Sequence, residues 1–280
     1  MRLLIALLVL LLTGGCTGVF MYPDNVRVID PSAYGLKFSE NLLQDGHGPD
    51  LIYWDIQAKG KYQGTILFLH GNAGNVSSHL RAVSWLPEEG YRVIMLDYRG
   101  YGGSQGDSEI RGIHHDAERM FRFVAAMEPD RSRRILFGQS LGASIALYTE
   151  GDLQHEEFFS AIIADSPFAS YRKITREKVG SFWLLYPFQY PISLLILDTY
   201  SPINMVKKIT VPTLFIHGQD DQIVLPHHSL DLCQAMKSYC TRWEIPGMDH
   251  IHALNGIGVR KRTIQWIQGV TSAAHGKGKH

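Results

Sequence analysis

The stretch GQSLG, from Gly138 to Gly142, places Ser140 between two glycines directly after an apolar run that ends at Phe137. An apolar strand before such a stretch and an Ala- and Leu-rich helix after it, here LGASIALYTE, are the setting of a sharp strand-to-helix turn that exposes a nucleophile. The alternative is a solvent-exposed turn serine. A serine hydroxyl is a weak nucleophile unless a base removes its proton, so the stretch also demands a histidine, an acid and oxyanion donors elsewhere.

The histidine is expected after the last predicted strand. The sequence IPGMDHIHAL follows the strand TRWEI and offers His250 and His252. Because the Pro-Gly pair opens a turn directly after that strand, His250 is the better placed to reach back over the sheet. His252 remains an alternative.

The acid is expected after the preceding strand, TLFIH. The loop HGQDDQIVLP offers Asp220 and Asp221, and Asp165, at the end of another strand, is a third candidate. A buried carboxylate that accepts a hydrogen bond from the imidazole fixes the tautomer of that ring and stabilises the cation formed during proton transfer.

The oxyanion donors are expected to be two backbone N–H groups. One is the amide of Leu141, which follows Ser140 at the start of a predicted helix, where the helix dipole is positive. The other is the amide of Asn72 in the loop HGNAGN, in which Gly71 and Gly74 allow close approach of the backbone to a substrate. The side chains of Asn72 and Asn75 could instead stabilise the turn.

Apolar runs bounded by turn residues alternate with amphipathic segments along the chain. Repeated strand and helix predict a mostly parallel sheet covered by helices on both faces. The strands are expected at 52–58, 65–69, 93–97, 134–138, 161–165, 213–217 and 242–245, and the helices at 77–89, 110–127, 141–150, 227–238 and 259–267.

One α/β domain is expected over residues 35–270, followed by a flexible tail over 271–280. Between about 168 and 205 the chain has no clear strand but carries several aromatic residues, among them Trp183. A helical insertion at this point would cover the carboxyl ends of the strands, where ligands bind in open α/β sheets, and we interpret it as a cap. The alternative is that these aromatic residues form the core of an ordinary helical layer.

The N-terminal sequence MRLLIALLVLLLTGGC resembles a lipoprotein-type export signal, with Arg2, an apolar run over 3–12 and small residues before Cys16. We expect a signal peptide over 1–15, a lipidated Cys16 and a tether over 16–34. The alternative is an uncleaved anchor, because 3–22 reaches the roughly 20 residues that a span requires. Both interpretations predict attachment to a membrane. The lipoprotein interpretation places the protein in the periplasm or at the cell exterior.

The other two cysteines, Cys233 and Cys240, could form a disulfide in an oxidising compartment. Seven residues along a continuous helix separate two Cα atoms by roughly 10 Å, which is too far for a disulfide. The bond is therefore possible only if the predicted helix ends before Cys240, and two unpaired buried thiols are the alternative.

Charge is balanced, with 27 Lys and Arg against 27 Asp and Glu. This balance argues against the basic surface of a nucleic-acid-binding protein, so no nucleic-acid partner is expected. Small substrates are favoured.

Five motifs together resemble those of small serine α/β-hydrolases related to eukaryotic membrane-associated protein depalmitoylases and to bacterial α/β-hydrolases. The resemblance covers roughly residues 34–267 and implies the α/β-hydrolase fold. In the HGxxDxxV motif of this family, the aspartate corresponds to Asp221 and the valine to Val224. The order Ser140, Asp221, His250 is also the order of the family. The motifs are HGNAGN, DYRGYGGSQG (97–106), GQSLG, DSPF (165–168) and HGQDDQIV.

We therefore expect a serine hydrolase that cleaves carboxylesters or thioesters of acyl groups through an acyl-enzyme intermediate, with a small acyl ester or thioester as substrate. Neither a metal nor an organic cofactor is expected. A serine peptidase of the same fold and a non-catalytic binding module are the alternatives, because one fold hosts many functions.

Overall fold

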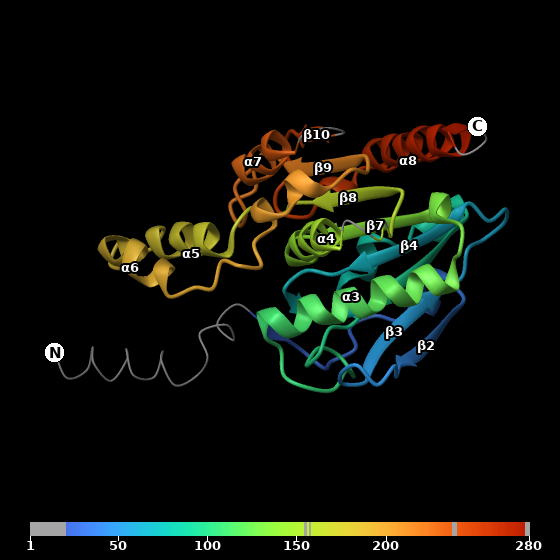
Figure 1. The fold of residues 1–280 in the computed structure, drawn as a ribbon, viewed down its shortest axis with the longest axis horizontal. Helices are drawn as coiled ribbons and strands as arrows, with labels where there is room; N and C mark the ends of the chain where they lie inside the picture. The colour runs from blue at the N-terminus through green and yellow to red at the C-terminus, as the bar shows by residue number, and fades with distance from the viewer. Residues whose placement is uncertain (1–20, 154–155, 157, 237–239, 278–280) are drawn as a thin grey trace.

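The computed structural model describes residues 21–153, 156, 158–236 and 240–277 (Figure 1). The expected signal peptide and Cys16 lie outside the described residues. Among those that are described, no helix combines the length and the apolarity needed to cross a bilayer.

An eight-stranded sheet forms the centre of the molecule, in the order β10-β9-β8-β7-β4-β6-β3-β2. The strands from β10 to β6 in this order are parallel, and β3 and β2 are antiparallel to their neighbours. The predicted, mostly parallel sheet is confirmed. Its bounds are β2 (Phe38–Leu43), β3 (Leu51–Ile56), β4 (Gly64–Leu69), β6 (Tyr91–Leu96), β7 (Arg134–Gln139), β8 (Ala161–Asp165), β9 (Thr213–Gly218) and β10 (Cys240–Ile245).

Successive residues of the central strands pack into two separate cores. In β4, Leu67 and Leu69 face the core that contains helices α3 and α4, whereas Ile66 and Phe68 face the core that contains helix α8. Because both faces are buried, the strand is continuously apolar, which is the pattern that made it recognisable in the sequence. The helices are α3 (Ile110–Met127), α4 (Leu141–Asp152), α7 (His227–Ala235) and α8 (Ile257–Lys277).

Two predicted segments differ from the structure. The single helix expected over 77–89 is wrong, because the segment divides into α2 (Val76–His79) and the 3-10 turns η3 (Leu80–Ala82) and η4 (Leu86–Glu89). Pro87 has no N–H for a continuous helical hydrogen-bond ladder. At the other end, α8 extends to Lys277, so the tail expected from 271 begins inside this helix.

Two cap helices follow β8, α5 (Tyr171–Gly180) and α6 (Gln189–Leu194), joined through the turn η6 (Tyr186–Phe188). Figure 1 shows α5 and α6 beyond the end of the sheet at which β7, β8 and β9 terminate. The base of the cap is closed by Asp198, whose Oδ1 accepts hydrogen bonds from Ser170 Oγ at 2.7 Å and from the Arg172 N–H at 3.0 Å.

The aromatic side chains of the cap face solvent. The side chain of Trp183 is 85% exposed, and those of Phe182 and Tyr186 are also mostly exposed. This finding overturns the alternative in which they form the core of a helical layer, and it places them outward rather than over the strand ends.

Helix α7 ends at Ala235 rather than at the expected residue 238, and Met236 has the extended φ and ψ of −72° and 135°. The chain therefore leaves the helical path before Cys240, and the Cα atoms of Cys233 and Cys240 lie 5.6 Å apart. The two residues form a disulfide that joins α7 to β10.

Candidate active site

Ser140 lies in a strained turn between β7 and α4, with φ of 52° and ψ of −114°. A Cβ atom at Gly138 would approach the Cα of Ala143 to 2.4 Å, and one at Gly142 would approach the carbonyl oxygen of Leu69 to 2.0 Å. Only glycine fits at these two positions. Ser140 is half-buried, so it is not the exposed turn serine of the alternative interpretation.

Ser140, His250 and Asp221 form a continuous hydrogen-bonded series. Ser140 Oγ lies 2.9 Å from His250 Nε2, and His250 Nδ1 lies 2.7 Å from Asp221 Oδ2. An ionised Asp221 can only accept, so His250 carries its proton on Nδ1 and offers the lone pair of Nε2 to the serine hydroxyl. This tautomer is the one that a general base requires.

The other candidates lie outside this series. His252 is 55% exposed and bonds to Asp249, and the side chain of Asp220 is exposed. Asp165 is fully buried, but its carboxylate accepts a hydrogen bond from Gln139 Nε2 at 3.0 Å. Tertiary structure thus separates His250 from His252 and Asp221 from its two rivals.

The carboxylate of Asp221 is fixed by its own loop and by His217. The N–H groups of Ile223 and Val224 both donate to Oδ1 at 2.8 Å, and His217 Nε2 lies 3.2 Å from Oδ2. Burial acts to raise the pKa of Asp221, but hydrogen bonds from His217 and His250 outweigh it and hold that pKa well below its ordinary value. Asp221 is consequently ionised when it orients His250.

His217 was not predicted as a site residue. It is fully buried, and its Nε2 also lies 2.8 Å from the carbonyl oxygen of Val224. The signal in the sequence was the histidine that opens HGQDDQIV, four residues before the acid.

The two expected oxyanion donors occupy different loops at the same edge of the sheet. Leu141 is the first residue of α4, where N–H groups have no acceptor within the helix. Asn72 follows β4, and its carbonyl oxygen accepts a hydrogen bond from Tyr101 Oη at 2.8 Å while its Oδ1 accepts from the Tyr22 N–H at 3.3 Å. The turn-stabilising role applies clearly to Asn75, which caps α2.

Gln139, which was also missed, connects these loops. Its Nε2 donates to Asp165, and its Oε1 lies 3.0 Å from His79 Nδ1. His79 Nε2 in turn lies 2.9 Å from the carbonyl oxygen of Ala73, in the loop of Asn72. Gln139, the residue before Ser140, therefore links the serine turn to the proposed oxyanion loop through the half-buried His79.

Backbone strain is concentrated around this site. Within the described part of the chain, the residues other than glycine with positive φ are Ser140, Ser166 and Ile251. Ile251 follows His250, and its N–H donates to Ser166 Oγ at 3.4 Å. A β-branched residue at positive φ is uncommon, and such conformations persist where the surrounding structure imposes them, often at functional sites.

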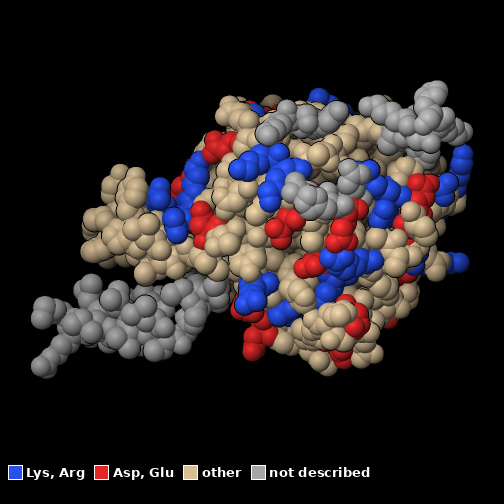
Figure 2. Space-filling view, viewed as in Figure 1, with Lys and Arg blue, Asp and Glu red and all other residues tan. Residues whose placement is uncertain are grey.

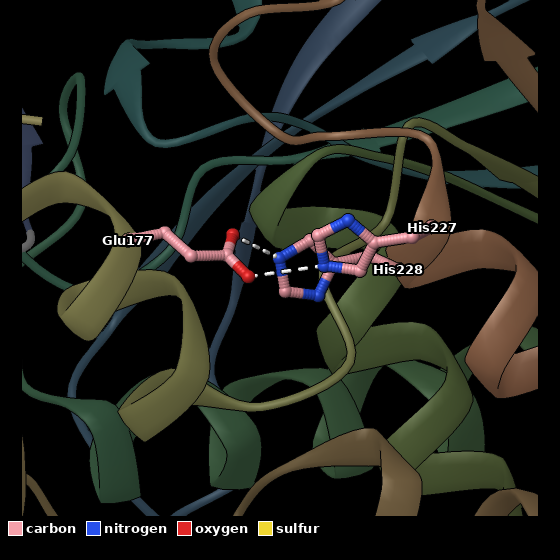
Figure 3. Close-up of side chains that lie close together, drawn as sticks. All are labelled: Glu177, His227 and His228. Carbon is pink, nitrogen blue, oxygen red and sulfur yellow. Dashed lines mark hydrogen bonds and ion pairs between the residues drawn. The ribbon is translucent and has the colours of Figure 1, made fainter. Parts of the chain in front are cut away.

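A second cluster of titratable side chains, Glu177, His227 and His228, lies between α5 and α7 (Figure 3). Glu177 Oε1 lies 3.0 Å from His227 Nε2, and Oε2 lies 2.8 Å from His228 Nε2. Two histidines and a carboxylate are suitable ligands for a transition metal. His228 Nδ1, however, accepts the Ala169 N–H at 3.1 Å, so in the neutral ring the proton is on Nε2, directed at Glu177.

A metal would need the lone pair of His228 Nε2, which this tautomer does not offer. The cluster fits a hydrogen-bonded clamp between the cap and α7 better than a metal site. Burial acts to raise the pKa of Glu177, but the hydrogen bond from His228 and the nearby charges outweigh it and lower that pKa.

Several known proteins resemble this chain in sequence or in fold. The family model described as "Serine aminopeptidase, S33" matches residues 60–189. A solved esterase structure from Pyrococcus furiosus has a TM-score of 0.71 at 19% identity, covering 91% of this chain and 98% of that one. The "Uncharacterized protein YfhR" of Escherichia coli O157:H7 is 33% identical over 245 residues, which cover 84% of this chain and 80% of that protein. This chain belongs to the α/β-hydrolase family.

This α/β-hydrolase is also 32% identical over 197 residues to the protein named "Lysophosphatidylserine lipase ABHD12" of Xenopus tropicalis. The match covers 67% of this α/β-hydrolase and 50% of that lipase. The resemblance to α/β-hydrolases that the motifs indicated is confirmed.

Proposed function

We propose that this α/β-hydrolase is a serine esterase that cleaves carboxylesters or thioesters of acyl groups through an acyl-enzyme intermediate. The observation that carries the proposal is the series Ser140 Oγ, His250 Nε2 at 2.9 Å, and Asp221 bonded to His250 Nδ1 at 2.7 Å. Local turn geometry alone would not bring three residues so distant in sequence within hydrogen-bond distance of one another, with the His250 proton on Nδ1.

In the first half of the reaction, His250 Nε2 accepts the proton of Ser140 while Oγ forms a bond to the acyl carbon. The negative charge passes to the former carbonyl oxygen, where the N–H groups of Asn72 and Leu141 would stabilise it. The bond to the leaving group then breaks, and His250 transfers its proton to the departing alcohol or thiol.

In the second half, water attacks the ester formed on Ser140. His250 accepts one proton from the water, a second tetrahedral anion forms, and its collapse returns the proton to Ser140 Oγ with release of the carboxylic acid. Asp221 stays ionised throughout and stabilises the imidazolium that forms twice.

Acyl lipids are the substrate class that we favour. A relative named as a lysophosphatidylserine lipase and an apolar cap beside the site both support this choice. The description of the matching family model supports aminopeptidase activity as the rival, although no anchor for a peptide ammonium group was identified in the sequence.

The test is hydrolysis of p-nitrophenyl esters and acyl thioesters of increasing chain length, of lysophospholipids and of aminoacyl p-nitroanilides, each with the chain and with Ser140→Ala. We expect turnover of esters or thioesters that depends on Ser140 and has a chain-length optimum. Turnover of the anilides alone would favour the peptidase. If Ser140 failed to react with a fluorophosphonate in folded protein and no substrate turned over, the binding module would be the better explanation.

We also propose that the chain is attached to a membrane facing the periplasm or cell exterior, through lipid on Cys16 or through an uncleaved N-terminal anchor. The apolar run over 3–12 and the Cys233–Cys240 disulfide support this location, since disulfides persist in oxidising compartments. Mass analysis of the protein extracted from membranes distinguishes the two forms. A diacylglyceryl adduct on Cys16 supports lipidation, and an intact Met1 without an adduct supports the anchor.

A further inference from the structure

We infer that the tip of the cap, residues 181–197, is a docking surface for a lipid bilayer that contains anionic lipids. This segment, called here the cap tip, has the sequence SFWLLYPFQYPISLLIL and contains no Asp, Glu, Lys or Arg. The inference concerns binding, so it stands whether or not Ser140 hydrolyses acyl esters.

The cap tip exposes an unusual quantity of apolar surface. Besides Trp183, its exposed side chains are those of Phe182, Leu184, Leu185, Tyr186, Phe188, Tyr190, Leu194, Leu195 and Leu197. Single exposed apolar residues are ordinary in soluble proteins, but a contiguous run marks a surface that contacts another apolar phase. Figure 2 shows a lobe without charged side chains at the place that α6 occupies in Figure 1.

The residue types of the cap tip match a bilayer interface. Trp and Tyr concentrate where an apolar phase meets water, because each ring has one polar group on an apolar body. The guanidinium of Arg176 lies 4.5 Å from the centroid of the Tyr190 ring, so an aromatic residue of the tip is in direct contact with a cation of α5.

Basic residues surround the base of the tip, which favours anionic lipids over neutral ones. Arg172, Lys173 and Arg176 line a cavity of about 310 Å³ at the base of the cap, together with Asp198 and Asp231. Lys173 is paired with Asp231, but Nε of Arg172 and of Arg176 is buried without a hydrogen-bond partner among the described residues. Figure 2 shows Lys and Arg side chains, with Asp and Glu side chains beside them, where the uncharged lobe joins the body.

The point at which the chain enters the fold supports a bilayer rather than a second copy of the chain. Tyr22 and Pro23 pair with Ala73 and Gly74 in the loop after β4, at the carboxyl edge of the sheet. The proposed membrane segment therefore precedes a residue at the same edge as the cap. A chain attached there would present this edge, and the cap tip with it, to the bilayer.

Docking would also position the catalytic edge. Lys178 Nζ, on α5, donates to the carbonyl oxygen of Gln222 at 3.0 Å, one residue after Asp221. The cap thus joins the loop of the proposed catalytic acid to the surface that would meet lipid.

The experiment uses the full chain in vesicles of phosphatidylcholine and phosphatidylglycerol whose acyl chains carry bromine, a short-range quencher of tryptophan fluorescence. Of the five tryptophans, Trp54 and Trp243 are buried and Trp183 is the most exposed. The difference in quenching between the chain and Trp183→Phe isolates the signal of Trp183. We expect Trp183 to account for most of the quenching, and removal of phosphatidylglycerol to reduce it severalfold.

The second variant carries Phe182→Asp and Leu184→Asp, with Leu42→Asp on edge strand β2 as the matched control at an exposed leucine. We expect the pair to abolish quenching of Trp183 and the control to leave it unchanged, with circular dichroism verifying the fold of each. Absence of Trp183-dependent quenching, whether the chain sediments with the vesicles or not, would overturn the inference. If quenching of Trp183 were lost and light scattering showed a dimer, the surface would be assigned to a second copy of the chain.

Discussion

Around Ser140 polar side chains are buried and held by partners, whereas the cap tip is apolar and lies in solvent. Asp221 accepts hydrogen bonds from two N–H groups of its own loop as well as from histidines, and both flanking glycines of Ser140 are closely packed. In contrast, Trp183 is 85% exposed.

The difference indicates that the two regions meet different requirements. Proton transfer needs atoms held at hydrogen-bond distance, which strand ends and buried networks supply. Contact with a lipid phase needs apolar area rather than exact position. We therefore expect substitutions at the strand ends to change catalysis, and substitutions in the cap to change binding or stability.

The largest expected effect separates His250 from His252. We expect His250→Ala to lower kcat on a soluble ester about 10⁴-fold, because Ser140 loses its proposed base. His252→Ala is the matched control and should stay within about twofold of the parent, since its partner is Asp249. Equal losses in the two variants would contradict the assignment of the base.

The next effect tests whether the network behind Asp221 contributes to catalysis. We expect His217→Leu to lower kcat about 10²-fold, because the carboxylate loses a donor and the imidazole loses its orientation. His217→Gln keeps an N–H donor and should recover part of the loss. The pH profile of kcat/KM is the informative measurement, because unfolding alone would lower the active fraction without moving the profile.

The disulfide is a stability feature away from the proposed proton-transfer series. Its cysteines are seven residues apart, and the chain-entropy estimate for closing so short a loop is about 2.5 kcal/mol. We expect Cys233→Ser with Cys240→Ser to lower the free energy of urea unfolding by about that amount. Turnover of a short soluble ester should remain within about twofold, and a loss parallel to that of His250→Ala would contradict this separation.

The smallest effect concerns the clamp between cap and body. We expect Glu177→Gln to lower the free energy of unfolding by about 1 kcal/mol at neutral pH, because the buried His228 loses a charged acceptor. The folded pKa of Glu177 is lowered from its ordinary 4.5, so its contribution is complete above that value and lost as the pH falls through the folded pKa. Urea unfolding of parent and variant should therefore converge in acid, and a difference independent of pH would contradict the clamp.

Much of the fold was predictable because its signals are local. Apolar runs bounded by turn residues identified seven of the eight strands of the central sheet, six of which are parallel. The amphipathic pattern of α3 predicted its bounds at Ile110 and Met127. Strand β2 was missed because it lies at the edge and half of its sequence, FSENLL, is polar. An edge strand depends on its neighbour more than on its own pattern.

The site was predictable to the level of motifs but not of contacts. Ser140 followed from the glycines around it, whose small size the turn requires. His217 and Gln139 were missed because each acts through residues distant in sequence, the first on Asp221 and the second between Asp165 and His79.

The residues alone predict most of the strands and the serine turn, because these depend on apolar periodicity and on steric limits of adjacent residues. The order of the proposed nucleophile, acid and base followed from the resemblance of the motifs to those of α/β-hydrolases. Tertiary structure alone decides which histidine forms a hydrogen bond with Ser140. It also decides that α7 ends early enough for Cys233 to bond to Cys240, and that the aromatic residues of the cap face solvent. Each of these outcomes depends on where distant segments come together, and burial, unlike periodicity, belongs to the folded chain as a whole.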